Sequence, residues 1–225
     1  MTAYPSIRAA LVLLGSLLAT TACNAKAGTA APLPAPVLDA PRAATSGQQT
    51  AVVAGGCFWG IQAVFQHVKG VISATSGYSG ASAKTAKYEI VSTGETGHAE
   101  SVEIVYDPSQ ITYGDLLRIF FSVAHDPTQL NRQGPDEGTQ YRSSIFYAND
   151  EQKHIAEAYI TQLDKAGIFP RPVVTKVVPL QAFYPAEAYH QNYAALHPSQ
   201  PYIMYNDAPK VEHLRQEFPD LYTGK

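Results

Sequence analysis

Cys57 is the residue of the chain whose type and position most favour chemistry. It follows Gly55 and Gly56 directly, where a helix is predicted to begin. Unpaired backbone N–H groups and the positive end of the helix dipole favour a thiolate at such a place, and the thiolate is the nucleophilic form of cysteine. The alternative is a buried, inert cysteine that packs as a small apolar side chain. Position alone does not separate the two interpretations.

Two aromatic side chains follow the cysteine. Phe58 has the spacing of the apolar face of the predicted helix, whereas Trp59, the single Trp of the chain, points about a quarter turn away, toward the sulfur. An ordinary half-buried core aromatic is the alternative for Trp59. The histidines His98, His125 and His190 have no spacing typical of metal ligands, so no metal site is expected.

The elements around these residues are predicted from periodicity and turn residues. Alternation predicts strands over residues 51–54, 71–77, 101–106, 144–148 and 173–178. Spacings of three and four predict helices from 57, from a Thr112 cap, over 149–166 and over 185–196. The order βαββαβ indicates an α+β fold, a ferredoxin-like two-layer sandwich (split βαβ) with added helices and a long irregular C-terminal tail. The aperiodic loop between His125 and Ser143 is long enough to be functional.

Composition excludes several classes of protein. The 225 residues carry a net charge of −3 without a basic run, which argues against nucleic-acid binding. Hydrophobic residues make up 45% and charged residues 16%, a globular mixture with one domain as the default. Two cysteines, Cys23 and Cys57, are too few for a disulfide scaffold or an all-cysteine zinc site.

The N-terminal region has a pattern typical of an export signal. Arg8 precedes a short apolar stretch over residues 9–18, which is too short to span a bilayer, and small residues lead into Cys23. This resembles a bacterial lipoprotein cleavage site, with residues 1–22 as signal peptide and Cys23 as a possible lipid anchor; a plain secretory signal is the alternative. Residues 23–48 are predicted to be an Ala/Pro-rich tether and residues 49–218 the folded domain. The expected location is the periplasm or cell envelope.

Three motifs carry a resemblance to a known family. They are Gly56-Cys57-Phe58-Trp59-Gly60, Gly97-His98-Ala99-Glu100 and the run from Asp136 to Ser143. In order and spacing they resemble the motifs of the peptide methionine sulfoxide reductase A family, over essentially the whole domain. The resemblance implies an enzyme that reduces methionine S-sulfoxide in proteins, and also free methionine sulfoxide, without a cofactor.

The resemblance also implies roles for individual residues. Cys57 is the nucleophile that attacks the sulfoxide sulfur, and Glu100 is the acid on the oxygen, which requires burial to raise the pKa of Glu100. Tyr88 and Tyr141 match two phenols that hydrogen-bond the oxygen, and Asp136 matches an acid that holds water and substrate.

Phe58 and Trp59 match the seat of the substrate methyl group, and the segment from Tyr189 to Tyr193 resembles one packed near the site. Many members of the family use resolving cysteines near the C-terminus, but this chain has none there. An external thioredoxin-like or small-thiol reductant is therefore expected to reset the Cys57 sulfenic acid. A monomer is expected.

Two rival functions remain open from the residues. One is a different cysteine enzyme, a thiol peroxidase or a Cys-His acyl transferase, which requires a basic histidine paired with Cys57. The other is an exported lipoprotein whose aromatic surface binds a ligand, with Cys57 merely buried.

Overall fold

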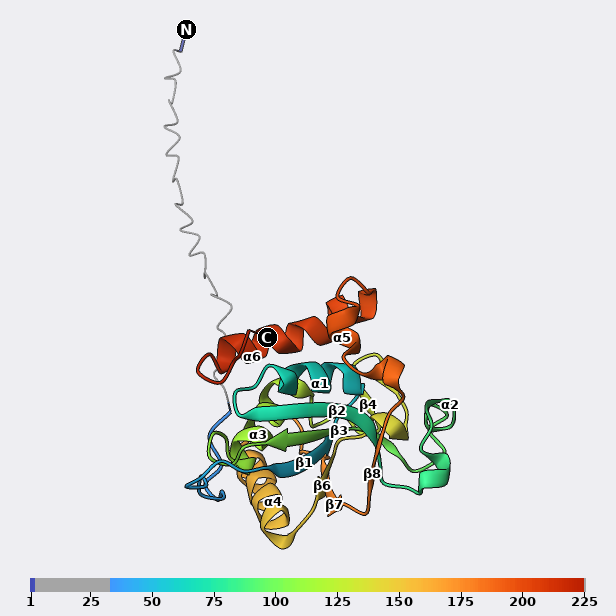
Figure 1. Cartoon of the computed structure of the whole chain (residues 1–225). Coiled ribbons are helices and arrows are strands. Elements are labelled where there is room, and N and C mark those ends of the chain that lie inside the picture. The colour runs from blue at the N-terminus through green and yellow to red at the C-terminus, as the bar shows by residue number, and fades with distance from the viewer. Residues whose placement is uncertain (3–32, 225) are drawn as a thin grey trace.

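A mixed six-stranded sheet with helices packed on it makes up the body of the protein in the computed structural model, which describes residues 1–2 and 33–224 (Figure 1). The strands of this sheet are β1 (Gln49–Ala54), β2 (Val71–Ser79), β3 (Ala99–Tyr106), β6 (Ser144–Tyr147), β7 (Lys176–Pro179) and β8 (Phe183–Pro185). Their order is β7-β6-β1-β3-β2-β8, with β6 and β7 parallel and all other neighbours antiparallel. Two short strands, β4 (Arg132–Gln133) and β5 (Asp136–Glu137), form a separate hairpin.

The helices differ widely in length. They are α1 (Phe58–Gln66), α2 (Tyr88–Val91), α3 (Tyr113–Ile119), α4 (Asp150–Lys165), α5 (Tyr193–Leu196) and α6 (Ala208–Glu217). A π-helical turn, Phe120–Ala124, continues α3, and a second one, Ile203–Asp207, leads into α6. Figure 1 shows α6 lying along the side of α1 that faces away from the sheet.

Both faces of the central strand β1 are buried. Ala51 and Val53 face the large core, which α1, α3 and α4 share, whereas Val52 and Ala54 face a smaller cluster on the other side of the sheet. Successive side chains of a strand point to opposite faces, so this run of four apolar residues fits a strand covered on both sides. The same alternation places Glu100 on the helical face of β3, in line with Val102 and Ile104 of the large core.

Two predicted helix starts are confirmed by their caps. Thr112 and Asp115 form a capping box at α3, and the Asn149 side chain accepts the N–H of Gln152 at α4. The helix predicted over residues 185–196 is wrong. Pro185 ends β8, and Asn192, with φ of +57°, separates a 3-10 turn at Ala188–His190 from the four residues of α5.

The predicted tether is also corrected where the structure describes it. From Leu33 onward the segment packs on the domain: Pro34 O accepts the Tyr159 hydroxyl at 2.8 Å, and Asp39 accepts the N–H of Gly114 at 2.8 Å. Donors from α3 and α4 thus satisfy backbone and side-chain acceptors of a segment that pairs with no strand. The predicted signal peptide and Cys23 lie outside the described residues, apart from residues 1–2.

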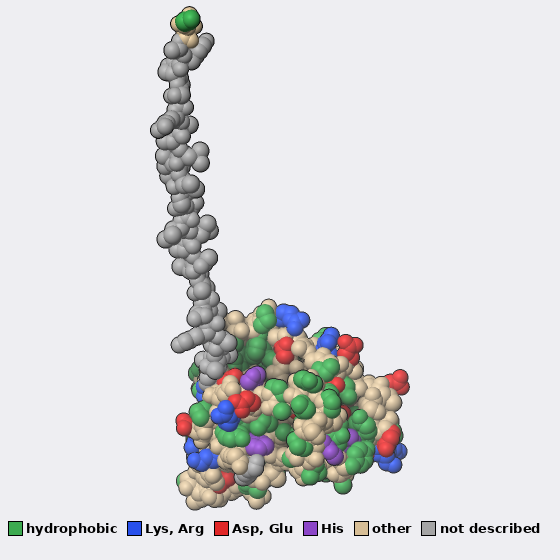
Figure 2. All heavy atoms as spheres, turned by 90° about the horizontal axis from the view of Figure 1, so that it is seen from above, with side chains coloured by type: hydrophobic (Ala, Val, Ile, Leu, Met, Phe, Trp, Pro, Cys, Tyr) green, Lys and Arg blue, Asp and Glu red, His purple; other side chains and the backbone are tan. Residues whose placement is uncertain are grey.

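The chain also packs beyond the predicted end of the domain at 218, because Tyr222 bridges to Val68. On the face shown in Figure 2, acidic and basic side chains are scattered among apolar ones. None of the described helices has the length and apolar character needed to cross a membrane.

Candidate active site

A tight turn between β1 and α1 places Cys57 at the start of the helix. Gly56 has φ of +103°, which L side chains rarely adopt, and a β-carbon there would lie 2.6 Å from Gln133 Cγ. A β-carbon on Gly55 would lie 2.8 Å from the His125 ring. Both positions therefore require glycine, and the turn delivers Cys57 to the N-cap of α1.

The thiol of Cys57 is nevertheless held in its neutral form at rest. Burial raises the pKa of Cys57 well above its ordinary value, and the carboxyls of Glu100 and Asp207 raise it further. The backbone N–H of Trp59 and the ammonium of Lys210 act in the opposite direction. The expected lowering of the Cys57 pKa by the helix N-terminus is thus wrong, because removal from water outweighs it.

Glu100 is the acid nearest to this helix start. Its side chain is 2% exposed, and Oε2 accepts the N–H of Phe58 at 3.1 Å. Burial raises the pKa of Glu100 to about 8, helped by Asp136 and Asp207, while the Phe58 N–H lowers it. The raised pKa predicted from the sequence is confirmed, so the carboxyl is protonated at neutral pH and can donate a proton.

Two phenols complete the polar side of the site. Burial raises the pKa of Tyr88 and of Tyr141. Negative charge on Glu100 or Cys57 raises both pKa values further. Each phenol therefore stays neutral and remains a hydrogen-bond donor. The structure brings both predicted tyrosines to the group formed by Cys57 and Glu100.

Asp136 is held by a residue that the sequence did not single out. The Tyr202 hydroxyl donates a hydrogen bond to Asp136 Oδ2, and the Tyr202 ring meets Trp59 edge-on at a centroid distance of 6.0 Å. Burial raises the pKa of Asp136, with the Tyr202 bond opposing it. Asp136 thus connects β5 to the C-terminal tail.

Trp59 is fixed by that same tail. Its ring stacks on Tyr193 with centroids 3.8 Å apart, and Nε1 donates to His190 Nδ1 at 3.3 Å. Phe58 is fully buried and lies 5.1 Å from the His190 ring. The two aromatics predicted to seat the substrate methyl group are therefore held in place before any substrate arrives.

Three residues near the cysteine were not predicted from the sequence as site residues: Tyr202, Asp207 and Lys210. Asp207 is the last residue of the second π-helical turn and pairs with Lys210 at 3.2 Å. Asp207 and Lys210 belong to no motif, and charged residues in a predicted surface tail are expected to be solvated. Only the path of the tail over α1 reveals them.

The rival functions find little support in this geometry. After burial, the groups that shift the pKa of Cys57 most are two carboxyls, a backbone amide and Lys210, and none of them is a histidine. His125 instead shares a hydrogen bond with Ser143 Oγ at 2.8 Å, and burial lowers the pKa of His125 to about 4. Within residues 33–224, no group of three or more His, Cys, Asp or Glu side chains is placed to hold a metal ion.

Fold and site together define a protein of the mixed α/β class with a buried cysteine and a buried carboxyl at the start of one helix. The family model for peptide methionine sulfoxide reductase matches residues 49–222. The chain belongs to that family, and it is accordingly an oxidoreductase.

Relatives and solved structures agree with this assignment. The chain is 63% identical over 182 residues to peptide methionine sulfoxide reductase MsrA 2 of Mesorhizobium japonicum, covering 81% of this chain and 93% of the relative. It is 52% identical to the MsrA 2 of Synechocystis over 84% of this chain and 89% of that relative.

Among solved structures, the reduced form of Mxr1 from Saccharomyces cerevisiae matches with a TM-score of 0.61 and 30% identity, over 70% of this chain and 92% of that one. Methionine sulfoxide reductase A of Corynebacterium diphtheriae matches with a TM-score of 0.59 and 34% identity, over 74% and 87%. The mixed α/β fold is therefore similar to that of solved methionine sulfoxide reductases.

Proposed function

We propose that the protein reduces methionine S-sulfoxide in proteins, and free methionine sulfoxide as well, with Cys57 as nucleophile and Glu100 as acid. The observation that carries the proposal is the hydrogen bond from Phe58 N–H to the buried Glu100. It places a protonated carboxyl beside the helix turn that starts at Cys57.

The chemical step balances without a cofactor. The Cys57 sulfur attacks the sulfoxide sulfur while Glu100 protonates the oxygen, and the proton of the thiol restores Glu100. The oxygen passes to Cys57, which becomes a sulfenic acid, and methionine leaves as the thioether. Tyr88 and Tyr141 donate hydrogen bonds to the oxygen as negative charge builds on it. Asp136 orders the water and substrate around them.

A single-turnover experiment tests this step. Purified protein is mixed with a methionine sulfoxide substrate without reductant, and methionine and the Cys57 oxidation state are measured by mass spectrometry. We expect about one methionine per enzyme and a trappable sulfenic acid, as the attack and transfer in the scheme require. No methionine together with an unmodified Cys57 would reject the proposal.

The methyl group of the substrate is proposed to sit against Phe58 and Trp59. The rigid clamp of Trp59 by Tyr193 and His190 supports this, since a fixed apolar wall orients the sulfoxide. Trp59→Ala is expected to lower kcat/KM for sulfoxide reduction about tenfold or more, by loss of that wall. A neighbouring change away from the wall, Gln66→Ala, is the control. An unchanged kcat/KM in Trp59→Ala would contradict this seat.

An external thiol is proposed to reset the enzyme. Cys57 is free, and the other cysteine, Cys23, precedes the folded domain. One thiol of a thioredoxin-like or small-thiol reductant forms a mixed disulfide with Cys57 and releases water, and a second thiol then frees Cys57. A Cys23→Ser variant should turn over with thioredoxin at the full rate. A Cys23–Cys57 disulfide after turnover would overturn this route.

Export to the periplasm or cell envelope is proposed from the N-terminal sequence, with Cys23 as the site of a lipid anchor. Its support is the apolar stretch followed by small residues and Cys23. Intact-mass analysis of membrane and soluble fractions tests it. An unlipidated mature form confined to the soluble fraction would reject the anchor.

The split βαβ, ferredoxin-like arrangement is proposed for the core of the fold. The order β6-β1-β3-β2 with antiparallel neighbours supports it. A monomer is proposed as the working form, since Glu100 and the ring that stacks on Trp59 reach the Cys57 turn from within the same fold. Light scattering of the purified protein at micromolar concentration measures this directly, and a stable dimer would contradict it.

A further inference from the structure

A buried ion pair lies against the first turn of α1. Lys210 Nζ is 3.2 Å from Asp207 Oδ1, with the two side chains 17% and 0% exposed. A β-carbon on Gly60 would collide with Asp207 Oδ1 and lie 2.7 Å from Lys210 Nζ. Gly60 follows Cys57 by three residues, so the pair touches the same helical turn that carries the thiol.

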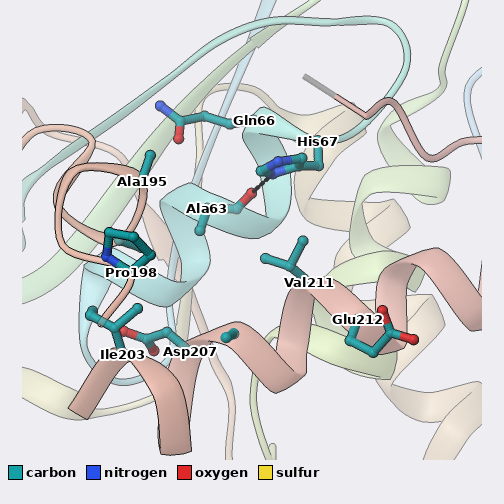
Figure 3. Close-up of a pocket in the computed structure, with 11 residues that line it drawn as sticks. Ala63, Gln66, His67, Ala195, Pro198, Ile203, Asp207, Val211 and Glu212 are labelled. Atoms are coloured by element: carbon teal, nitrogen blue, oxygen red, sulfur yellow. Dashed lines mark hydrogen bonds between the residues drawn. The ribbon is translucent and has the colours of Figure 1, made fainter. Parts of the chain in front are cut away.

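Burying this ion pair costs free energy, which indicates that the pair has a function. Asp207 Oδ2 is buried without a hydrogen-bond partner, and burial raises the pKa of Asp207 while Lys210 lowers it. On its other side Asp207 borders a pocket of about 270 Å³ whose lining is mostly apolar, including Ala63, Ile203 and Val211 (Figure 3). Lys210 thus favours the charged form of the Asp207 carboxyl.

Lys210 also supplies a positive charge where the chemistry needs one. Apart from His190, whose pKa burial lowers, the other titratable side chains around Cys57 are acids: the carboxyls Glu100, Asp136 and Asp207 and the phenols Tyr88, Tyr141 and Tyr202. Lys210 itself is faced by Asp207, Asp136 and His125, and it lines a surface pocket together with Asp126 and His213. His125 is neutral at pH 7, because burial lowers its pKa to about 4. Near the thiol, the positive charge comes from Lys210.

We propose that Lys210 is a positioning residue that stabilises the thiolate of Cys57 during attack, and that Asp207 anchors its ammonium against Gly60. This rests on Cys57 being the nucleophile of the proposed function. The thiol is neutral at rest, so attack requires that a negative charge form on sulfur in a site with little water. A fixed ammonium at the same helical turn lowers the free energy of that charge.

The test measures the thiol directly. The rate of Cys57 alkylation by iodoacetamide is followed against pH in wild type, Lys210→Gln and Lys210→Arg. Gln keeps a hydrogen bond to Asp207 but removes the charge, whereas Arg keeps the charge. We expect Lys210→Gln to raise the alkylation midpoint by about one pH unit or more and to slow single-turnover sulfoxide reduction at pH 7 about tenfold. KM should change little, and Lys210→Arg should restore most of the loss.

A matched control uses the same helix. Arg215→Gln removes one positive charge from α6 on its solvent side, where Arg215 is 54% exposed and pairs with Glu212. It should leave the alkylation midpoint unchanged. If Lys210→Gln does not fold by circular dichroism, Lys210→Met, which keeps the length of the side chain, is measured in its place.

A wild-type alkylation midpoint in Lys210→Gln or its substitute, with wild-type single turnover, would overturn the role of Lys210. Failure of the proposed function looks different, because wild type itself would then release no methionine. An equal shift in Arg215→Gln would also overturn the inference, since the effect would belong to net charge and not to this ammonium.

Discussion

The protonation states of Cys57 and Glu100 decide the pH range in which sulfoxide reduction can run. The reaction starts from a protonated Glu100, whose pKa burial raises to about 8, and from a thiol whose pKa burial also raises. Glu100 must keep its proton while Cys57 loses its own. The two requirements overlap around neutral pH only if the bound substrate and Lys210 favour the thiolate.

Glu100 should lower the stability of the fold as pH rises. Its pKa is about 8 in the folded protein and about 4.3 in an unfolded chain, so between these values the folded state binds more protons and stability falls with rising pH. We expect Glu100→Gln to exceed wild type in unfolding free energy by about 2–4 kcal/mol at pH 8 and by little at pH 4.5. Urea titrations at both pH values measure this.

In the same variant, single-turnover sulfoxide reduction should fall at least a hundredfold at pH 7, because the proton donor is gone. Exposed Glu95→Gln serves as the control. Equal stability of Glu100→Gln and wild type at both pH values would show that the carboxyl is not held protonated by the fold.

Residues within a motif were predictable from the sequence, and residues that meet only in space were not. Cys57, Glu100 and Tyr141 belong to runs with specific chemistry. Asp207 and Lys210 become visible only once the tail is known to cross the start of α1, a contact across roughly 150 positions of sequence. The resting protonation of Cys57 was missed for a related reason, because burial by distant segments does not show in local spacing.

At the scale of elements, the turn between β1 and α1 decides where the thiol lies. Gly56→Ala combines an unfavourable φ of +103° with a contact 2.6 Å from Gln133, so we expect a loss of about 2–4 kcal/mol in unfolding free energy and most of the activity. Denaturant unfolding and kcat/KM give both values.

Gly134→Ala is the matched control for that change. Gly134 also has positive φ, +56°, but a β-carbon there meets nothing within 4 Å. Gly134→Ala should lower the unfolding free energy by only about 1 kcal/mol and should retain activity. Equal losses in both variants would mean that the turn does not depend on the close approach of Gln133.

The regular elements were predictable where local signals are strong. Strands β1, β2, β3 and β6 follow from short apolar runs between turn residues, and the caps at Thr112 and Asn149 follow from side chains that accept backbone N–H groups. The path of residues 185–196 was not predictable. Their apolar spacing is typical of a helix, but Pro185 and the positive φ of Asn192 interrupt a helix there. Tertiary contacts of Tyr193 with Trp59 and of Glu187 with Tyr78 and Tyr88 decide its path.

At the scale of the whole molecule, the segment over residues 33–48 behaves as part of the domain. Tyr159, Gly114 and Thr112 donate hydrogen bonds to it, and Leu33 packs against the large core. Composition alone suggested a free tether, because Pro and Ala give no periodicity. The partners that hold this segment lie far away in the sequence and could not be read from it.

Truncation tests this part of the fold. A chain that begins at residue 49 should lose about 2–4 kcal/mol in unfolding free energy relative to one that begins at residue 33, through lost hydrogen bonds and apolar contact. Asp39→Ala, which removes the acceptor for Gly114, should lose about 1 kcal/mol. Thermal and urea unfolding measure both. Equal stability of the two truncated chains would mean that the segment only rests on the surface.

The tail that fixes Trp59 and carries Lys210 leaves the ribosome long after the turn that carries Cys57. At 5–20 residues per second, roughly eight to thirty seconds separate the synthesis of Cys57 from that of Lys210. Throughout this interval the thiol has neither its aromatic clamp nor its ion pair. The nascent chain therefore carries an unshielded cysteine, and pulse alkylation of stalled ribosomes should label Cys57 until the C-terminal segment has emerged.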